Sequence, residues 1–189
     1  MKRFILAITG ASGVAYAARL FACLKGRAEL HVVVSDRGGE LLSLELGMTA
    51  ADFAGDHVTR HKNSKINTSI ASGSFRADAM VVVPASMGTL GRIAAGVSET
   101  LIERAADVML KEKRKLIVVP REAPLSTVHL KNLLALDQAG ALVLPASPGF
   151  YQKPQTVEDL VDFVVARILD QLDMVQDLMQ PYAPDGKSL

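Results

Sequence analysis

Short, uninterrupted runs of apolar residues recur along the chain and predict β-strands that are covered on both faces. These runs span residues 3–8, 29–34, 79–83, 116–119 and 142–144, and a further short strand is expected at residues 57–61. Polar and apolar positions do not alternate in these runs, which is typical of strands buried on both sides of a parallel sheet. The pattern therefore favours a mostly parallel sheet.

Helical spacing of apolar residues fills the segments between the predicted strands. We expect helices over residues 13–24, 36–46, 89–95, 100–113 and 127–139. In a last helix, Val157, Leu160, Val161, Val164, Val165, Ile168, Leu169 and Leu172 follow the i, i+3, i+4, i+7 rhythm, and Thr156 with Asp159 resembles a capping box at its start. Residues 47–76 are polar and mixed, and they give no clear pattern beyond the short strand.

Alternating strands and helices indicate repeated βαβ units. We predict an α/β fold of three layers with a doubly wound, Rossmann-like or flavodoxin-like, mostly parallel sheet. Residues 1–189 are expected to form a single domain, with a loosely held C-terminal tail from about residue 181. Neither a linker nor an internal repeat interrupts the pattern.

Composition narrows the classes of protein to consider. With 21 Lys and Arg against 20 Asp and Glu, the net charge is +1, which argues against nucleic-acid binding through bulk positive charge. The longest uncharged runs, residues 4–18 and 138–152, are broken by Gly or Pro, so no membrane span is expected. A mean hydropathy of +0.23 suggests buried subunit interfaces, and hence a homo-oligomer.

Cys23 is the only cysteine, so intrachain disulfides and multi-cysteine zinc sites are excluded. This usage fits a reducing, cytoplasmic setting, and Cys23 itself lies in an apolar stretch typical of a small core residue. His57 and His61 have the spacing of a metal pair on a helix, but no third ligand is evident. We therefore expect no metal site.

Two small-residue loops follow predicted strands and are candidates for ligand binding. Thr9-Gly10-Ala11-Ser12-Gly13 follows the first strand, and Pro84-Ala85-Ser86-Met87-Gly88-Thr89 follows the third, which Pro84 is expected to end. Ligands of open parallel sheets bind at the carboxyl ends of the strands, where backbone N–H groups and helix N-termini favour phosphate. The alternative interpretation of each motif is a tight turn in which Ser12 or Ser86 is a helix N-cap. Ser35, after the second strand, has the same two interpretations.

Charged and aromatic residues add a second group of candidates. Arg121 and Glu122 follow the fourth strand between two prolines, and Arg has the planar fork that suits phosphate. Arg104 and Lys111 are seven residues apart and share a helix face, which by itself is typical of a solvated surface. The proline-rich loop at residues 145–154 presents Phe150 and Tyr151, either to a ligand or as a packed connector.

Together these segments resemble the flavin prenyltransferase family of the UbiX type, within a wider flavoprotein group that includes cysteine decarboxylases. The matching pieces, over residues 3–173, are Thr-Gly-Ala-Ser-Gly at 9–13, Ser-Gly-Ser at 72–74, Leu-Ile-Glu-Arg-Ala-Ala-Asp-Val at 101–108, Leu-Lys-Glu at 110–112, Val-Pro-Arg-Glu-Ala-Pro at 119–124, His-Leu-Lys-Asn at 129–132, Pro-Gly-Phe-Tyr at 148–151 and Val-Val-Ala-Arg-Ile-Leu at 164–169. Their order along the chain makes the resemblance specific.

The resemblance implies an enzyme that uses no metal and transfers a dimethylallyl group from dimethylallyl monophosphate to N5 and C6 of reduced FMN. It further implies a dodecamer with sites at subunit contacts, whose prenylated FMN serves a UbiD-type decarboxylase, for example in ubiquinone biosynthesis.

By position, the resemblance implies that FMN is bound by Gly10, Ala11, Ser12, Ser35, Ser86, Met87, Gly88, Thr89 and Arg121. It implies that the prenyl phosphate is bound by Arg104, Lys111, Arg121, Tyr151 and Arg167, with Glu122 as a carboxylate partner. The implied catalytic set is Ser12 near flavin N5, Glu45 in proton movement, Arg121, Glu122 and Tyr151. Tyr182 matches a late aromatic position that packs on the site in some relatives.

Two other functions remain as alternatives. The first is an FMN-dependent cysteine decarboxylase, whose Pro-Ala-Ser-Ala-Asn-Thr motif resembles residues 84–89. Gly88 replaces the Asn of that motif, no His occurs between His61 and His129 where the catalytic one is expected, and Pro124 is followed by Leu-Ser-Thr instead of the group's Pro-x-Met-Asn. The second is a non-catalytic flavin carrier, which would not need the basic residues.

Overall fold

The computed structural model describes residues 1–180, which fall into two compact units. The first unit runs from Met1 to Ala146, and the second begins at Ser147. Among the described residues, the strands and helices α1 to α5 belong to the first unit, and α6 (Val157–Gln171) belongs to the second. The predicted tail and Tyr182 lie outside the described residues, and the single domain stays a prediction.

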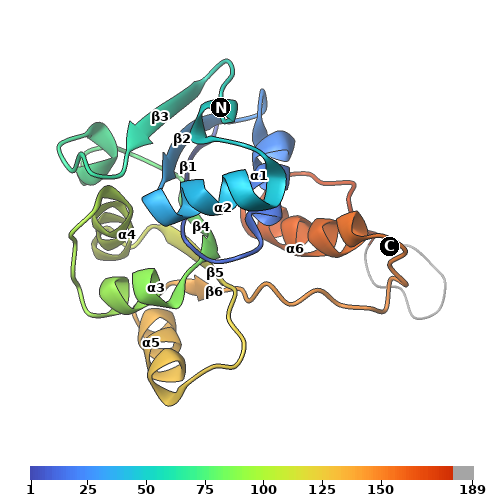
Figure 1. The fold of residues 1–189 in the computed structure, drawn as a ribbon. Helices are drawn as coiled ribbons and strands as arrows, with labels where there is room; N and C mark the ends of the chain where they lie inside the picture. The colour runs from blue at the N-terminus through green and yellow to red at the C-terminus, as the bar shows by residue number, and fades with distance from the viewer. Residues whose placement is uncertain (181–189) are drawn as a thin grey trace. The chain divides into compact units, whose positions relative to one another are not determined.

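The first unit is built on one parallel sheet, as predicted (Figure 1). Its strands are β1 (Arg3–Ile8), β2 (Glu29–Val34), β3 (Val58–Lys62), β4 (Ala79–Ala85), β5 (Lys115–Pro120) and β6 (Leu142–Val143). They are arranged in the order β3-β2-β1-β4-β5-β6, and every neighbouring pair is parallel. The direction of winding reverses between β1 and β4, and in such doubly wound sheets ligands bind at that point.

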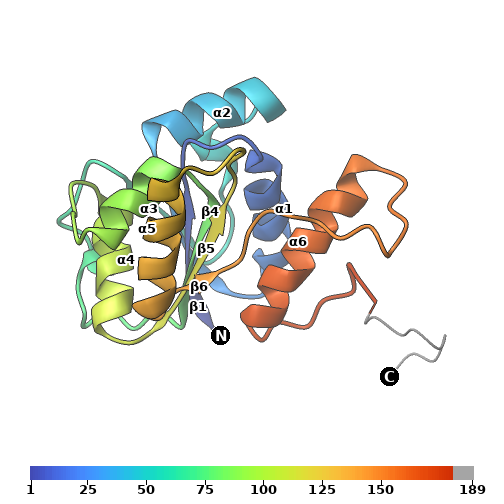
Figure 2. The ribbon, with the colours of Figure 1, turned by 90° about the horizontal axis from the view of Figure 1, so that it is seen from below.

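Helices cover both faces of this sheet, because its central strands are apolar on both sides. The helices of the first unit are α1 (Val14–Leu24), α2 (Asp36–Leu46), α3 (Met87–Ala94), α4 (Leu101–Lys111) and α5 (Thr127–Gln138). Figure 2 shows α3, α4 and α5 on one face and α1 on the other. Alternate residues such as Ile5 and Ala7 join the core under α3, α4 and α5. Their neighbours Phe4, Leu6 and Ile8 are equally buried and face the opposite way.

The segment before β4, which gave no clear pattern, contains two 3₁₀ turns, η1 (Ala50–Asp52) and η2 (Ser69–Ala71), on either side of β3. The strand expected at residues 57–61 starts at Val58, because His57 has a left-handed φ of 61°. As the edge strand, β3 has one buried neighbour strand and a polar, mostly exposed sequence. This one-sided burial explains why its hydrophobic signal is weak.

Two predictions of detail are wrong. Pro84 does not end β4, which continues to Ala85 because Ala85 pairs with Pro120 after an irregularity in the register. Cys23 is only partly buried, since the buried side of α1 is formed by its neighbours Leu20, Phe21 and Leu24.

Candidate functional site

Hydrogen bonds through Thr9 join the loops that follow β1 and β4. Thr9 is 1% exposed, and its Oγ1 donates to the Pro84 carbonyl at 2.8 Å. The same oxygen accepts from the Ser86 N–H at 2.8 Å. One buried hydroxyl thus fixes residues 10–13 beside residues 86–89, at the carboxyl edge of the two central strands.

The loop after β2 reaches the same edge. The Ser35 N–H donates to the Ile8 carbonyl at 2.9 Å. A side chain at Gly10 has no space there, because a Cβ on this residue would lie 2.4 Å from Cβ of Arg37 in the first turn of α2. The close approach of α2 therefore requires a glycine at position 10. Gly10, Ala11 and Ser35 lie together, as predicted from the parallel topology.

Arg121 adds a cation to this group of loops. Its backbone N–H donates to the Ala85 carbonyl at 3.4 Å, and its Nε donates to the Ser12 carbonyl at 3.1 Å. Arg121 is partly exposed, so its guanidinium remains in contact with solvent at the site. The structure thus brings Ser12, Ser86 and Arg121 together from three different strand ends.

Tyr16 borders the site and was missed by the sequence analysis. A Cβ on Gly13, which has a left-handed φ of 101°, would lie 3.1 Å from the Tyr16 ring and 3.8 Å from Cγ of Arg121. Burial raises the pKa of the Tyr16 hydroxyl, and the nearby charge of Arg121 opposes that rise. The feature of the sequence that could have indicated Tyr16 is its position one helical turn after Gly13.

Each of the helices α1, α2 and α3 starts at this edge with a different cap. Ser35 caps α2 by accepting from the Gly38 N–H at 3.0 Å, and Ser86 caps α3 by accepting from the Thr89 N–H at 3.4 Å. Ser12 does not cap α1, because Gly13 is the N-cap residue and has no side chain. The Glu45 carboxylate performs this role from α2, with Oε2 2.9 Å from the Gly13 nitrogen and 3.2 Å from the Val14 nitrogen.

The predicted cations of α4 have partners of their own within the chain. Arg104 donates from Nε to the Ala71 carbonyl at 3.2 Å and from Nη1 to Asp107 at 2.9 Å. Lys111 Nζ lies 3.6 Å from a carboxylate oxygen of Glu112. Neither pairing involves the loops joined by Thr9. Within the described part of one chain, Arg104 and Lys111 are therefore not part of the cluster around Arg121.

Glu122, beside Arg121, is exposed, and its carboxylate accepts from the backbone N–H of Ala123 at 3.1 Å.

The second unit holds the remaining predicted residues. Tyr151 packs edge-on against Phe163 with ring centroids 5.6 Å apart, and its hydroxyl lies 3.8 Å from Sδ of Met179. Gly149 is required beside them, because a Cβ there would lie 2.8 Å from the Phe163 ring. Arg167 on α6 is exposed and forms an ion pair with Asp170 at 2.7 Å.

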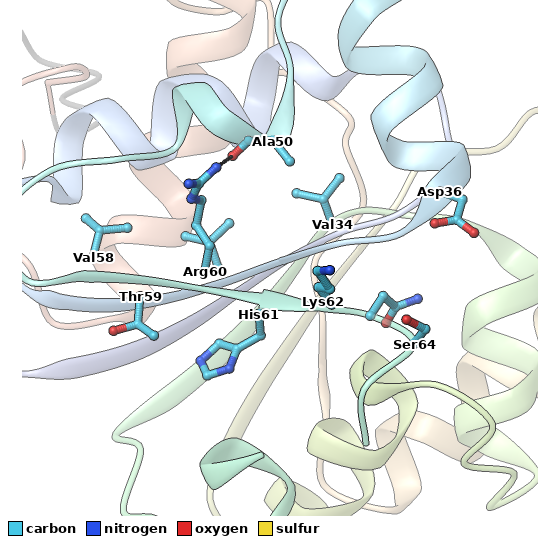
Figure 3. A pocket seen from close by; sticks show the side chains of 11 residues that line it. Val34, Asp36, Ala50, Val58, Thr59, Arg60, His61, Lys62 and Ser64 are labelled. Atoms are coloured by element: carbon cyan, nitrogen blue, oxygen red, sulfur yellow. Dashed lines mark hydrogen bonds between the residues drawn. The ribbon is translucent and has the colours of Figure 1, made fainter. Parts of the chain in front are cut away.

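A cavity of about 750 Å³ lies against the edge strand β3 (Figure 3). Arg60 crosses it and donates to the Ala50 carbonyl at 3.2 Å, whereas His61 points to the opposite side of the strand. None of the predicted site residues lines this cavity. The candidate site is instead the edge where the loops of β1, β2, β4 and β5 meet.

Residues 1–180 contain no group of three or more His, Cys, Asp or Glu side chains placed to hold a metal ion. In the same range, no helix combines the length and the apolar character that crossing a membrane requires.

The donor set at this edge suits an anion attached to a polar ring. It combines the N-terminus of α3, the hydroxyl of Thr89 and the guanidinium of Arg121. Helix N-termini and Arg forks bind phosphate, and hydroxyl and amide donors match the carbonyl groups of a heteroaromatic ring.

Comparison with known proteins identifies the relatives of this chain. The profile of the Flavoprotein family matches residues 1–169. The flavin prenyltransferase UbiX of Halalkalibacterium halodurans is 45% identical over 186 residues, covering 93% of this chain and 90% of that protein.

Two solved structures superpose on nearly the whole chain. A dodecameric FMN-dependent UbiX-like decarboxylase from Escherichia coli O157:H7 has a TM-score of 0.92 and 42% identity, covering 96% of this chain and 99% of its own. AnUbiX, solved in complex with FMN and dimethylallyl pyrophosphate, also has a TM-score of 0.92, with 38% identity over 96% of this chain and 97% of its own. This chain therefore belongs to the Flavoprotein family and, within it, to the UbiX-type flavin prenyltransferases.

Proposed function

We propose that this protein transfers a dimethylallyl group from dimethylallyl monophosphate to N5 and C6 of reduced FMN. The observation that carries the proposal is the joining of three strand ends, those of β1, β4 and β5, into one donor-rich edge through Thr9 and Arg121. The similarity to AnUbiX, which was solved with FMN and dimethylallyl pyrophosphate, supports it. In that reaction the allylic C–O bond would break and the phosphate would leave with the bonding electrons. The bonds to N5 and C6 would replace an N–H and a C–H bond; one released proton would leave on the phosphate, and the other would add to the inner carbon of the allylic double bond, which is consumed.

The loops at this edge would bind FMN. Gly10, Ala11 and Ser12 would line the bound FMN from the first loop, and Ser35 and residues 86–89 offer helix N-termini and hydroxyls. Arg121 would serve both ligands: its Nε is engaged by Ser12, and within residues 1–180 its terminal nitrogens have no hydrogen-bond acceptor, so they can face an anion. When bound, reduced FMN supplies the nucleophilic N5 and then C6.

The chain's own residues would stabilise the leaving phosphate. Negative charge grows on its oxygens as the C–O bond breaks, and cations already in place stabilise that charge without reorganising water. We assign this role to Arg104, Lys111, Arg121 and Arg167, with Tyr151 as a neutral donor and Glu122 as a carboxylate partner of the cluster. The protein would also exclude water from the allylic carbon and align it with the acceptor.

Ser12 and Glu45 would act at the acceptor. We assign Ser12 to the neighbourhood of N5, and its carbonyl is fixed by Arg121. Glu45 is an exposed carboxylate that accepts from the Gly13 N–H at the end of the same loop, at the start of α1. A carboxylate there can accept a proton released by the flavin and return it later, which is general acid–base catalysis.

We further propose that the active protein is a dodecamer with sites at its subunit contacts. The E. coli O157:H7 relative is dodecameric. In this chain, Leu125, Val128, Leu130 and Leu134 in and before α5 are between 42% and 64% exposed, an apolar surface suited to contact with a second copy. Such contacts would allow another copy to supply Arg104 and Lys111, whose partners within residues 1–180 are Ala71, Asp107 and Glu112.

The product, prenylated FMN, would be consumed by a UbiD-type decarboxylase, and the cytoplasm would be the site of this exchange. A decarboxylase activity of the chain itself is the competing function, because a relative carries that name. The absence of a His between His61 and His129 argues against the cysteine decarboxylase chemistry.

One experiment separates these functions. The protein is incubated anaerobically with reduced FMN and dimethylallyl monophosphate, and the extracted flavin is weighed by mass spectrometry, with a parallel sample lacking the prenyl phosphate. A flavin heavier by one prenyl unit, only in the complete mixture, supports the proposal. Unchanged flavin that stays bound indicates a carrier, and carbon dioxide released from a cysteine-ended peptide indicates a decarboxylase; either result overturns it.

A further inference from the structure

Glu103 is a buried carboxylate that the proposed reaction does not use. It lies in the first turn of α4 and is 1% exposed. One oxygen accepts from Nε of Arg92, and the other accepts from the N–H groups of Glu99 at 3.0 Å and Thr100 at 2.8 Å. A buried charge is tolerated only when it is paired and hydrogen-bonded. Glu103 meets this condition with both oxygens, so it fixes the orientation of Arg92.

Arg92 reaches from Glu103 to the loop that we assign to FMN. Its Nη2 donates to Oγ1 of Thr89 at 3.4 Å. Its Nη1 lies 3.7 Å from the place that a Cβ on Gly88 would occupy. A guanidinium is a rigid planar fork, so fixing Nε on Glu103 also fixes the two terminal nitrogens. The side chain of Arg92 is 41% exposed, and its charge therefore lies at the border between this loop and solvent.

The hydroxyl of Thr89 accepts two hydrogen bonds and is left with a hydrogen to donate. Oγ1 accepts from Oγ of Ser86 at 3.0 Å and from Arg92. A hydroxyl has one hydrogen and two lone pairs, so both acceptor positions are filled. Within residues 1–180, the Thr89 hydroxyl has no hydrogen-bond acceptor, although the residue is only 6% exposed. The hydrogen is thus available to an acceptor that residues 1–180 do not supply.

We infer that Arg92 and Glu103 are positioning residues that hold the Thr89 hydroxyl as a hydrogen-bond donor toward an oxygen of bound FMN. The inference rests on the proposed function, in which residues 86–89 bind FMN. Arg92 fills a lone pair of Oγ1, and Glu103 keeps Arg92 in place. The acceptor on FMN is an oxygen of its phosphate or of its ring, and the two are distinguished by binding riboflavin, which lacks the phosphate.

The test is a double-mutant cycle on FMN affinity, measured by quenching of flavin fluorescence. We expect Thr89→Val and Arg92→Met each to weaken binding about tenfold, the size of one buried hydrogen bond. If Arg92 acts through Thr89, adding Arg92→Met to Thr89→Val produces no further loss. A second tenfold loss in the double variant overturns the inference, because it shows that Arg92 acts independently of the hydroxyl.

Arg92→Lys separates positioning from charge compensation. A lysine still neutralises Glu103, but its single ammonium group cannot also reach Thr89. We expect Arg92→Met to have a lower thermal midpoint than wild type, because Glu103 loses its partner. Arg92→Lys should have the thermal midpoint of wild type but bind FMN as weakly as Arg92→Met. Recovery of both properties overturns the inference. Arg3→Met, which removes the Arg3–Glu29 ion pair, is the matched control and should leave FMN affinity unchanged.

Riboflavin identifies the acceptor. If Thr89 donates to the phosphate, Thr89→Val weakens FMN binding but not riboflavin binding; if it donates to the ring, both fall together, and either result supports the donor role. Equal FMN affinity of Thr89→Val and wild type overturns it. A wild-type protein that binds no FMN would instead overturn the proposed function itself.

Discussion

The Glu45 carboxylate lies 2.9 Å from the backbone nitrogen of Gly13, so the last turn of α2 caps the start of α1. Gly13 has no side chain to offer, and Ser12 does not fill the role. A carboxylate at a helix N-terminus is stabilised by the N–H groups and by the helix dipole. The residue that we assign to proton movement is therefore also a structural cap, and these two roles can be separated experimentally.

Glu45→Gln should retain the cap and lose the proton-transfer group, because an amide oxygen still accepts from the Gly13 N–H. We expect its unfolding free energy to stay within about 0.5 kcal/mol of wild type, while turnover falls about a hundredfold. Glu45→Ala should lose turnover to a similar extent and also about 1 kcal/mol of stability. Denaturant unfolding and the flavin mass assay measure the two effects. Full activity in Glu45→Gln would exclude the proton-transfer role.

Arg121→Ala should lower turnover more than it lowers FMN affinity. The guanidinium is expected to stabilise charge that develops only as the phosphate leaves, and loss of one such donor costs about 10² to 10³ in rate. Its bond to the Ser12 carbonyl contributes to ground-state binding, for which about tenfold is expected. The rate and the dissociation constant for FMN are measured separately. A proportional loss of both would count against a role in the chemical step.

Tyr151→Phe removes a hydroxyl and keeps the ring that packs against Phe163. If the hydroxyl binds the leaving phosphate, turnover should fall about tenfold, while FMN affinity and the thermal midpoint stay at wild-type values. Phe163→Leu, which disturbs the ring contact without touching the hydroxyl, serves as the comparison. Unaltered turnover in Tyr151→Phe would remove this residue from the proposed phosphate site.

Acid should destabilise the protein through His61. His61 Nε2 lies 2.9 Å from Nδ1 of His31, whose Nε2 lies 3.1 Å from a Glu29 oxygen. Burial, and then the neighbouring His31, lower the pKa of His61 from 6.5. The neutral form is thus favoured in the folded state, so its stabilisation is complete above about pH 6.5 and is lost as the pH falls below that value.

The measurement is the thermal midpoint between pH 8 and pH 5. Wild type should lose stability below about pH 6.5, and His61→Gln should show a flatter profile in this range. His57→Asn, at an exposed histidine with a left-handed φ, should behave like wild type. Glu29 adds a second loss at lower pH, because its hydrogen bond with Arg3 is the main cause that lowers the pKa of its carboxyl. A steep profile retained in His61→Gln would contradict the assignment.

The parallel sheet could be predicted from sequence because its central strands are buried on both faces. Residues 3–8 and 29–34 are strands with the predicted bounds, and the capping box of Thr156 and Asp159 is confirmed at the start of α6. The prediction is weak where burial is one-sided and where the extent of a strand depends on pairing with a distant segment. The edge strand β3 carries little apolar signal, and the extension of β4 to Ala85 depends on pairing with Pro120, which no local pattern reveals.

Only the part of the site that follows from the topology of the sheet could be predicted from sequence. Loops after parallel strands must share one edge, so Ser12, Ser86 and Arg121 were expected together, and they are. Contacts that depend on side-chain length were not foreseen. Examples are Tyr16 against Gly13, and Arg92 reaching back one turn to Thr89. The placement of Arg104 and Lys111 beside Arg121 is not found within one chain and stays a prediction about the assembly.

Thr9→Val tests whether the joined loops are what creates the site. Valine has the shape of threonine but cannot accept from the Ser86 N–H or donate to the Pro84 carbonyl. The Ser86 N–H would be left buried without this partner, which costs about 1 to 3 kcal/mol of stability. We also expect FMN affinity to fall more than tenfold, because residues 10–13 and 86–89 are no longer fixed to each other. Thr9→Ser keeps the hydroxyl and should retain FMN affinity despite losing a buried methyl group. If Thr9→Val binds FMN as tightly as Thr9→Ser, each loop is positioned by its own strand and helix. The joining of the loops through Thr9 would then not explain FMN binding, and the proposed function would lose its main structural support.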